Sequence, residues 1–184
     1  MKKLMVFLHG KGAHKDDPKY KVIYEIAKKR DVEVFAINAP EPHKAGYKWF
    51  DKKSGELAPD EIKPITDFVS EKIDDELRIR GFSYSDIIIA GHSQGGFLAM
   101  YIALLKGAKE VIALTSSFHQ CEMIENANYT DFKLYWIEAG KDSVVSKEAK
   151  EGYKLLQNIS VEVKYIFSEQ STHDDFDLDI VDII

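Results

Sequence analysis

Residues 87–105 read IIIAGHSQGGFLAMYIALL, and this stretch decides the fold. The apolar run 87–90 is typical of a buried strand and the apolar run 97–105 of a buried helix, and the residues between them match G-x-S-x-G. On so sharp a turn a serine is held out of the packing on both sides, and Gly91 and Gly95 lack the Cβ atoms that would collide. Because a strand and a helix flank the motif, we interpret Ser93 as a candidate nucleophile rather than part of an ordinary Gly-rich turn.

Strand-like and helix-like segments alternate along the rest of the chain. Apolar, β-rich runs predict strands near 3–8, 32–37, 86–90, 109–114, 132–138 and 160–167. Helical patterns predict helices near 18–30, 64–80, 94–106, 146–157 and 175–183. Such alternation indicates an α/β fold in which helices cover both faces of a mainly parallel sheet of about six strands. No linker or repeat is visible, and we expect residues 1–184 to form a single domain.

A nucleophilic serine needs a base, because its hydroxyl is a weak nucleophile at neutral pH, and the base needs an orienting carboxylate. Where the nucleophile lies on a strand-turn-helix motif, the acid and the base follow it along the chain, in the order Ser, Asp or Glu, His. The only histidines after Ser93 in the sequence are His119 and His173. His173 lies in a polar loop after the strand-like run 161–167, so we predict it to be the base. His119 precedes every well-placed acid and is assigned to the substrate-binding site instead.

The candidate acid is Asp142. It lies on the loop after the strand predicted at 132–138 and before the helix predicted from 146. A turn aspartate that caps local amides is the alternative. Chain order favours catalysis, in which the carboxylate accepts a bond from the imidazole and fixes its tautomer.

Catalysis also needs donors that face the developing oxyanion. One is commonly the amide of the residue after the serine, here Gln94, and another comes from the loop after an earlier strand. The first predicted strand ends in His9-Gly10-Lys11-Gly12, whose glycines let the backbone approach a bound carbonyl, so we assign the Lys11 amide. We expect His9 to hold this loop by hydrogen bonds rather than to act as a base. The loop does not have the spacing of a phosphate-binding loop.

Together these residues resemble the carboxylesterase, phospholipase and acyl-protein thioesterase family of small α/β-hydrolases. The resemblance covers nearly the whole chain and rests on residues 8–12, 49–51, 91–96, 140–142, 144–145 and 173. It implies an α/β-hydrolase fold without a large cap domain or cofactor, acting on carboxylic esters, with thioesters and lysophospholipids as related substrates. It also implies Ser93, Asp142 and His173 as triad and Lys11 and Gln94 as oxyanion donors. The alternative is a hydrolase-fold protein that binds a ligand or partner without turnover.

The sequence departs from the family pattern at two places. Members often carry glycine immediately before the histidine, where this chain has Thr172. The second oxyanion position is often apolar in relatives and is Lys11 here. Because the backbone amide is the donor, the chemistry survives, and the nearby ammonium leads to the hypothesis that acidic substrates are favoured.

A long loop runs from Ala39 to about Glu61 and contains Trp49 and Phe50. A loop of this length is either a lid or a packed brace. Its aromatic residues either form an acyl pocket or anchor the loop to the core, and the sequence leaves both open. We include Trp49 and Phe50, with His119, among the candidate substrate-binding residues.

Composition and charge bound the class of protein. Of the 184 residues, 45% are hydrophobic, which is enough to fill a single core. The formal net charge is −6 and the charged residues are not gathered into a basic stripe, which argues against nucleic-acid binding and against stable association with anionic membranes. The single cysteine, Cys121, excludes an internal disulfide and is compatible with a cytoplasmic enzyme acting on a small-molecule ester or thioester. The oligomeric state is left open.

The C-terminal run 174–184 is rich in aspartate, which could suggest a metal site. Helical spacing offers a simpler explanation, because Phe176, Ile180, Ile183 and Ile184 would form one inward stripe and leave the carboxylates in solvent. We therefore predict a helix near 175–183 and no metal site.

Overall fold

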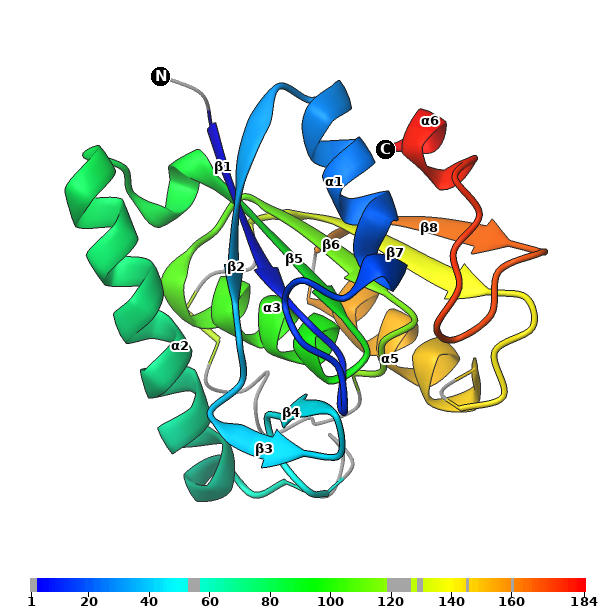
Figure 1. Ribbon diagram of the computed structural model, residues 1–184, viewed down its shortest axis with the longest axis horizontal. Helices are drawn as coiled ribbons and strands as arrows, with labels where there is room; N and C mark the ends of the chain where they lie inside the picture. Colours follow the sequence, from blue (N-terminus) through cyan, green and yellow to red (C-terminus); the bar gives the residue numbers. More distant parts are fainter. Residues whose placement is uncertain (1–2, 53–56, 119–126, 129–130, 145, 160) are drawn as a thin grey trace.

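The computed structural model describes residues 3–52, 57–118, 127–128, 131–144, 146–159 and 161–184. A parallel six-stranded sheet in the order β2-β1-β5-β6-β7-β8 forms its centre (Figure 1). Its strands are β1 (Lys3–Leu8), β2 (Val32–Ile37), β5 (Ile87–His92), β6 (Glu110–Leu114), β7 (Lys133–Ala139) and β8 (Glu162–Ser168). The helices are η1 (Pro18–Tyr20), α1 (Lys21–Lys29), α2 (Pro59–Arg80), η3 (Tyr84–Asp86), α3 (Gln94–Lys106), α5 (Ser146–Asn158) and α6 (Ile180–Ile183).

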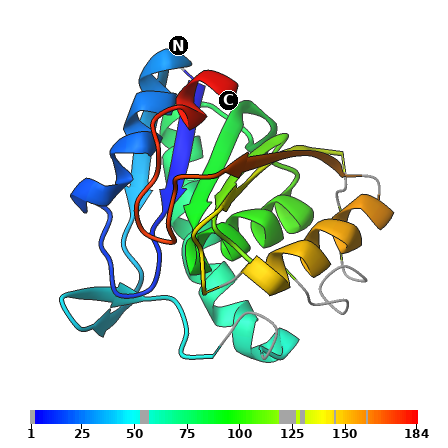
Figure 2. The same cartoon turned by 90° about the vertical axis from the view of Figure 1, so that its right-hand side faces the viewer.

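Helices cover both faces of the sheet, so the predicted α/β fold class is confirmed (Figure 2). Side chains alternate along each strand, and those of one face pack on α2, α3 and α5, whereas those of the other pack on α1 and α6. Helix α3 lies deepest, because residues 95–104 are all buried, and this explains the continuous apolar run in its sequence. Among the described residues no helix is long and apolar enough to cross a membrane.

Two helices differ from their predicted bounds. Helix α2 begins at Pro59 rather than near Pro64, because Pro59 suits the first helical position and the Glu61 carboxylate accepts the Ala58 amide at 2.9 Å. Pro64 lies inside the helix.

The predicted helix near 175–183 is wrong for most of its length, since α6 contains only Ile180–Ile183. The preceding residues are held by hydroxyl groups, as Ser171 Oγ accepts the Asp177 amide at 2.9 Å and Thr172 Oγ1 accepts the Asp175 amide at 3.1 Å. Phe176 and Ile180 are buried as the stripe predicted, whereas Ile183 is 44% exposed.

A hairpin of β3 (Glu41–His43) and β4 (Gly46–Lys48) interrupts the long loop after β2 and was not predicted. It is bonded to the loop after β1, because Tyr47 accepts the Gly12 amide and donates its own amide to Ala13, both at 2.8 Å. A Cβ atom on Gly46 would lie 2.3 Å from the Ala13 carbonyl oxygen, so only glycine allows this approach. The hairpin therefore braces the loop to which we assign an oxyanion amide.

Candidate active site

Ser93 lies between β5 and α3 in a strained backbone conformation, with φ 51° and ψ −114°. Glycines allow the turn to be this tight. A Cβ atom on Gly91 would lie 2.2 Å from the Gly95 carbonyl oxygen, and one on Gly95 would lie 2.1 Å from the Leu8 carbonyl oxygen. The Ser93 amide donates to the Leu114 carbonyl at 2.9 Å, which ties the turn to the end of β6. The strand-turn-helix context predicted from the sequence is therefore present, and the strain is of the kind that proteins keep at functional sites.

The structure brings Ser93, His173 and Asp142 into one chain of hydrogen bonds. His173 Nε2 lies 3.1 Å from Ser93 Oγ, and its Nδ1 lies 2.9 Å from Asp142 Oδ2. The Asp142 side chain is only 1% exposed, and its other oxygen accepts the Val144 amide at 2.6 Å. The carboxylate therefore caps a local amide, as the structural alternative proposed, and at the same time receives the imidazole N–H. This arrangement places the proton of His173 on Nδ1 and leaves Nε2 free to accept from the serine.

The loops that carry the acid and the base leave neighbouring strands. β7 and β8 pair up to their last residues, Ala139 and Ser168. The Gly140 amide then donates to the Ser168 carbonyl at 2.8 Å, and the Lys141 amide donates to the Ser171 carbonyl at 3.0 Å. These bonds extend the ladder beyond the sheet and fix the two loops against each other.

The peptide between Gly10 and Lys11 has a defined orientation. Its carbonyl oxygen accepts from His9 Nδ1 at 2.8 Å and from the Ala13 amide at 3.3 Å. In a trans peptide the N–H points opposite to the carbonyl, so the Lys11 amide faces away from these donors. This amide makes no hydrogen bond to any described residue. It is therefore free to donate to an oxyanion.

The peptide between Ser93 and Gln94 is fixed in the same way. Its carbonyl oxygen accepts from the Phe97 amide and from Ser116 Oγ, both at 3.1 Å. The Gln94 amide is therefore directed out of the N-terminus of α3, where helix amides lack partners within the helix.

Trp49 and Phe50 are buried and anchor the long loop. Trp49 is 1% exposed and donates from Nε1 to the His9 carbonyl at 2.7 Å, while the Phe50 ring packs edge-on against Phe97. The Gln94 side chain accepts the Trp49 amide at 3.3 Å and donates to the Phe50 carbonyl at 2.8 Å. The anchoring alternative thus describes their contacts, and a contact with substrate stays a prediction. His119 lies outside the described residues.

His9 holds the loop after β1, as expected. Its Nε2 accepts the Ala39 amide at 3.0 Å, and its Nδ1 donates to the Gly10 carbonyl. Burial lowers the pKa of His9, so the ring stays neutral and keeps both bonds.

Tyr20 and His92 also contact the site and were not predicted to do so. Tyr20 Oη accepts the Gly10 amide at 2.8 Å and lies 3.1 Å from His92 Nδ1. His92 Nε2 lies 2.7 Å from the His173 carbonyl oxygen. His92 had one usable signal, since alternation along β5 directs its side chain to the α1 face of the sheet. Tyr20 had none, because its contacts come from distant parts of the chain.

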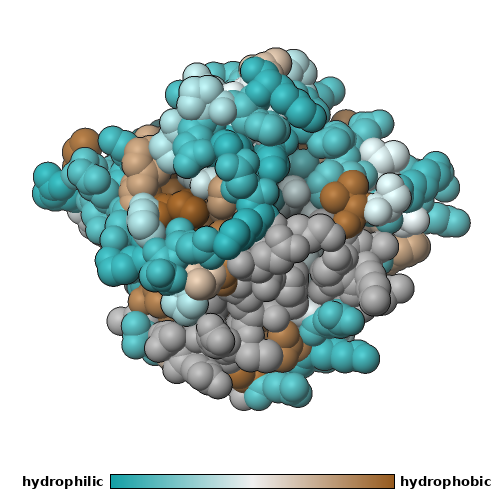
Figure 3. Space-filling view, turned by 90° about the horizontal axis from the view of Figure 1, so that it is seen from below, coloured by the Kyte–Doolittle hydropathy of each residue, from teal (hydrophilic) through white to brown (hydrophobic). Residues whose placement is uncertain are grey.

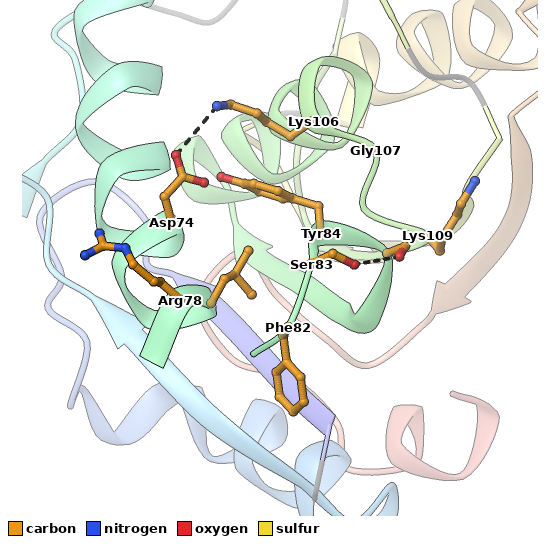
Figure 4. A pocket seen from close by; sticks show the side chains of 10 residues that line it. Asp74, Arg78, Phe82, Ser83, Tyr84, Lys106, Gly107 and Lys109 are labelled. Carbon is orange, nitrogen blue, oxygen red and sulfur yellow. Dashed lines mark hydrogen bonds and ion pairs between the residues drawn. The ribbon is translucent and has the colours of Figure 1, made fainter. Parts of the chain in front are cut away.

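A surface cavity of about 570 Å³ lies at the amino ends of the strands, opposite Ser93, where α2 and α3 end and β5 and β6 begin (Figure 4). It is lined by Asp74, Leu77, Arg78, Phe82, Ser83, Tyr84, Ser85, Lys106, Gly107 and Lys109. Each of its three cationic side chains forms an ion pair: Arg78 with Asp75, Lys106 with Asp74 and Lys109 with Asp131. Cations are also favourable at helix C-termini, so these residues are explained without a ligand.

On the side of the molecule where the β3–β4 hairpin lies, the described residues are mainly hydrophilic, with small scattered apolar areas (Figure 3). Within the described part of the chain, no group of three or more His, Cys, Asp or Glu side chains could hold a metal ion. The groups that the site presents for chemistry are a hydroxyl, an imidazole, a carboxylate and two backbone amides.

The parallel sheet and the serine turn after β5 define an α/β-hydrolase fold. The chain belongs to the phospholipase/carboxylesterase family, whose model matches residues 1–175. The resemblance inferred from the sequence is thereby confirmed. A search of curated proteins found no match.

Several solved structures share this fold, two of them named as esterases. Esterase PE8 superposes with a TM-score of 0.84 at 23% identity, over 99% of this chain and 89% of that one. A carboxylesterase from Mesorhizobium loti gives 0.79 at 17% identity, over 98% and 86%. SOBER1 from Arabidopsis thaliana gives 0.83 at 16% identity, over 100% and 95%. At these identities the likeness shows the fold.

Proposed function

We propose that the chain is a serine hydrolase that cleaves carboxylic esters through an acyl-enzyme on Ser93. The observation that carries the proposal is the pair of hydrogen bonds from Ser93 Oγ to His173 Nε2 and from His173 Nδ1 to Asp142. A nucleophile within reach of a base, with the base oriented by a third group, is the arrangement that such catalysis needs. Membership of the phospholipase/carboxylesterase family supports the same reaction class.

Acylation begins when Ser93 Oγ attacks the ester carbonyl carbon and its proton passes to His173 Nε2. The carbonyl oxygen becomes an oxyanion that accepts from the Lys11 and Gln94 amides. Asp142 remains ionised and stabilises the imidazolium. The bond to the leaving oxygen then breaks, and His173 returns the proton to that oxygen, which releases the alcohol.

Deacylation repeats the sequence with water. His173 Nε2 takes a proton from water as the water oxygen attacks the acyl carbon, and the same amides hold the second oxyanion. The bond to Ser93 Oγ breaks, the serine regains its proton from His173, and the carboxylic acid leaves. No oxidant, reductant or further reactant is needed for this cycle.

Thioesters and lysophospholipids are further substrates of the same site, since both present an acyl carbonyl with a leaving group that His173 can protonate. The Lys11 ammonium supports a preference for acidic substrates. Lys11 is exposed, and its Nζ donates to the Asp51 backbone carbonyl at 3.1 Å, so the charge is held beside the loop that carries the oxyanion amide.

The direct test is intact-mass measurement after exposure to a fluorophosphonate, which labels an activated serine with little demand on substrate fit. We expect one adduct on the parent and none on Ser93→Ala. The surface variant Ser85→Ala is a matched control, because Ser85 is exposed and lies near the amino end of β5, and it should label like the parent. A folded parent that does not label would favour the alternative of a hydrolase-fold protein that binds a ligand or partner without turnover.

A further inference from the structure

Tyr20 and His92 connect two parts of the proposed active site that come from distant strands. The connection runs from the Gly10 amide to Tyr20 Oη, then to His92 Nδ1, and from His92 Nε2 to the His173 carbonyl, at 2.8, 3.1 and 2.7 Å. At one end is the loop that carries the Lys11 amide. At the other end is the backbone of the candidate base.

The donors and acceptors of this chain are determined by chemistry. A carbonyl oxygen can only accept, so His92 Nε2 carries the hydrogen on that side. In the neutral ring Nδ1 is then an acceptor, and the Tyr20 hydroxyl must donate to it. The Gly10 amide can only donate, so the Tyr20 oxygen accepts from it. Each hydrogen bond in the chain thus has a single direction, and this pattern requires a neutral His92 and a neutral Tyr20.

Burial keeps both groups neutral. His92 is fully buried between Gly10, Phe176 and the rings of Tyr20 and His173. Burial lowers the pKa of His92 to about 3, with a smaller contribution from His173, and burial raises the pKa of Tyr20. The other charged groups that act on His92 are Lys19 and Asp174, which pair with each other at 2.7 Å, so their effects oppose.

The packing leaves His92 no room to turn. A Cβ atom on Gly10 would lie 2.4 Å from His92 Nδ1, so the loop after β1 packs directly on the imidazole. The Phe176 ring also meets the imidazole edge-on, at 5.5 Å between centroids. His92 is therefore a fixed spacer between the two loops as well as a hydrogen-bonding group.

Topology explains why the base needs such a support. His173 follows β8 at the edge of the sheet, whereas Ser93 follows β5, and β6 and β7 lie between them. With strands about 4.8 Å apart, the loop after β8 has to reach back roughly 14 Å to meet the serine. There the His173 carbonyl accepts from His92, on β5, and from Thr115 Oγ1, just after β6, at 3.2 Å.

We propose that Tyr20 and His92 are positioning residues of the reaction: their hydrogen bonds hold the Gly10 backbone and the His173 backbone in register with Ser93. The inference rests on the proposed function. It assigns no proton transfer to either side chain, because both act through the residues that they hold. Its consequence is that loss of the hydroxyl of Tyr20, a fully buried residue, lowers the rate of the chemical step.

The test compares Tyr20→Phe with Tyr24→Phe by steady-state hydrolysis of p-nitrophenyl acetate. Each variant loses one phenolic hydroxyl, and Tyr24 is 40% exposed, with its Oη donating to the Lys15 carbonyl at 3.3 Å. We expect Tyr20→Phe to lower kcat about 10- to 100-fold with KM changed less than about 3-fold, since small misplacements of catalytic groups have effects of that size. Tyr24→Phe should match the parent. A merely structural role would lower the melting temperature of Tyr20→Phe and leave kcat per folded molecule unchanged, which would overturn the inference.

Two variants of His92 make the test independent of Tyr20→Phe folding. His92→Gln keeps an acceptor for Tyr20 and a donor for the His173 carbonyl, whereas His92→Leu keeps neither. We expect His92→Gln to retain most of the parental kcat and His92→Leu to lose it, and equal kcat values in the two would overturn the inference. Fluorophosphonate labelling of the parent separates the two proposals: a parent that labels and turns over, with an unaffected Tyr20→Phe, refutes the positioning role alone. A parent that does not label refutes the proposed function.

Discussion

The turn that carries Ser93 and the segment 39–50 packed against it owe their shapes to different kinds of contact. The turn depends on its own glycines, because a Cβ atom on Gly91 would meet the Gly95 backbone and one on Gly95 would meet the backbone at the end of β1. The segment takes its shape from residues distant in the sequence. Its Ala39 amide donates to the His9 side chain, and Trp49 donates to the His9 carbonyl and to the Gln94 side chain. A locally determined element can be predicted from a short motif, whereas an element held from outside cannot.

The largest effect is expected from substitution of Gly95 in the serine turn. Gly95→Ala places a Cβ atom 2.1 Å from the Leu8 carbonyl oxygen and 2.6 Å from that of His9. Because backbone has to move, we expect a loss of about 3 kcal/mol or more in unfolding free energy and loss of esterase activity, measured by urea denaturation and turnover. Gly81→Ala is the control: no atom lies within 4 Å of its Cβ, and only its positive φ of 69° adds strain, so about 1 kcal/mol is expected. Equal losses in the two variants would contradict a turn built by close backbone contact.

The pH dependence of stability tests the buried His92 beside the turn. Its pKa is about 3 in the folded chain, against 6.5 for the free side chain, so the unfolded chain binds the extra proton between these values. Stability therefore falls as pH decreases through that window. From pH 7.5 to pH 5 we expect His92 to contribute about 2 kcal/mol of this fall, which His92→Gln should lack. Parallel curves for parent and variant in urea titrations at each pH would show that His92 titrates normally.

The attachment of the segment 39–50 to the turn is tested by Gln94→Met. The substitution removes the side-chain bonds to Trp49 and Phe50 and keeps the backbone amide that we assign to the oxyanion. We expect a loss of about 1–2 kcal/mol in unfolding free energy, because the buried Phe50 carbonyl loses its donor. The value of kcat should fall less than about 10-fold, since removing an oxyanion donor itself would cost about 100-fold or more. A larger fall in kcat without a change in stability would mean that the side chain acts in the chemistry.

The smallest effect is expected at Lys11, on the loop that the hairpin braces. If its ammonium favours acidic substrates, Lys11→Ala should lower kcat/KM for an ester that bears a carboxylate a few-fold more than for its neutral analogue, as expected for an exposed charge. Lys52→Ala is a charge-matched control. Unchanged ratios in Lys11→Ala would remove the proposed preference and leave the ester chemistry intact.

The parts of the fold that were predicted closely are those whose own sequence decides them. The bounds of β1, β2 and α3 match the predicted 3–8, 32–37 and 94–106. β1 and α3 contain continuous apolar runs of strand and helix length, and β2 is rich in β-branched residues. The serine turn was found for the same reason. His173 and Asp142, which lie in one chain of hydrogen bonds with Ser93, were predicted from the order in which such loops follow the serine turn along the chain.

The parts that were missed depend on contacts between distant residues. Pro42 lowers the strand propensity of β3, which forms because Tyr47 pairs with the loop after β1. The predicted C-terminal helix is shortened because Ser171 and Thr172 offer its amides other acceptors. Tyr20 joins the site only because η1 packs against the end of β5, which no local pattern in the sequence indicates.

The central claim is that Ser93 forms the acyl-enzyme with help from His173, and trapping that intermediate tests it most directly. The parent and His173→Ala would be quenched with acid during turnover of p-nitrophenyl acetate and examined by peptide mass mapping. We predict an acetyl group on Ser93 in the parent, and in His173→Ala a rate of acetylation lowered about 1000-fold or more. An acetyl group on another residue, or hydrolysis that persists unchanged in Ser93→Ala, would contradict the account.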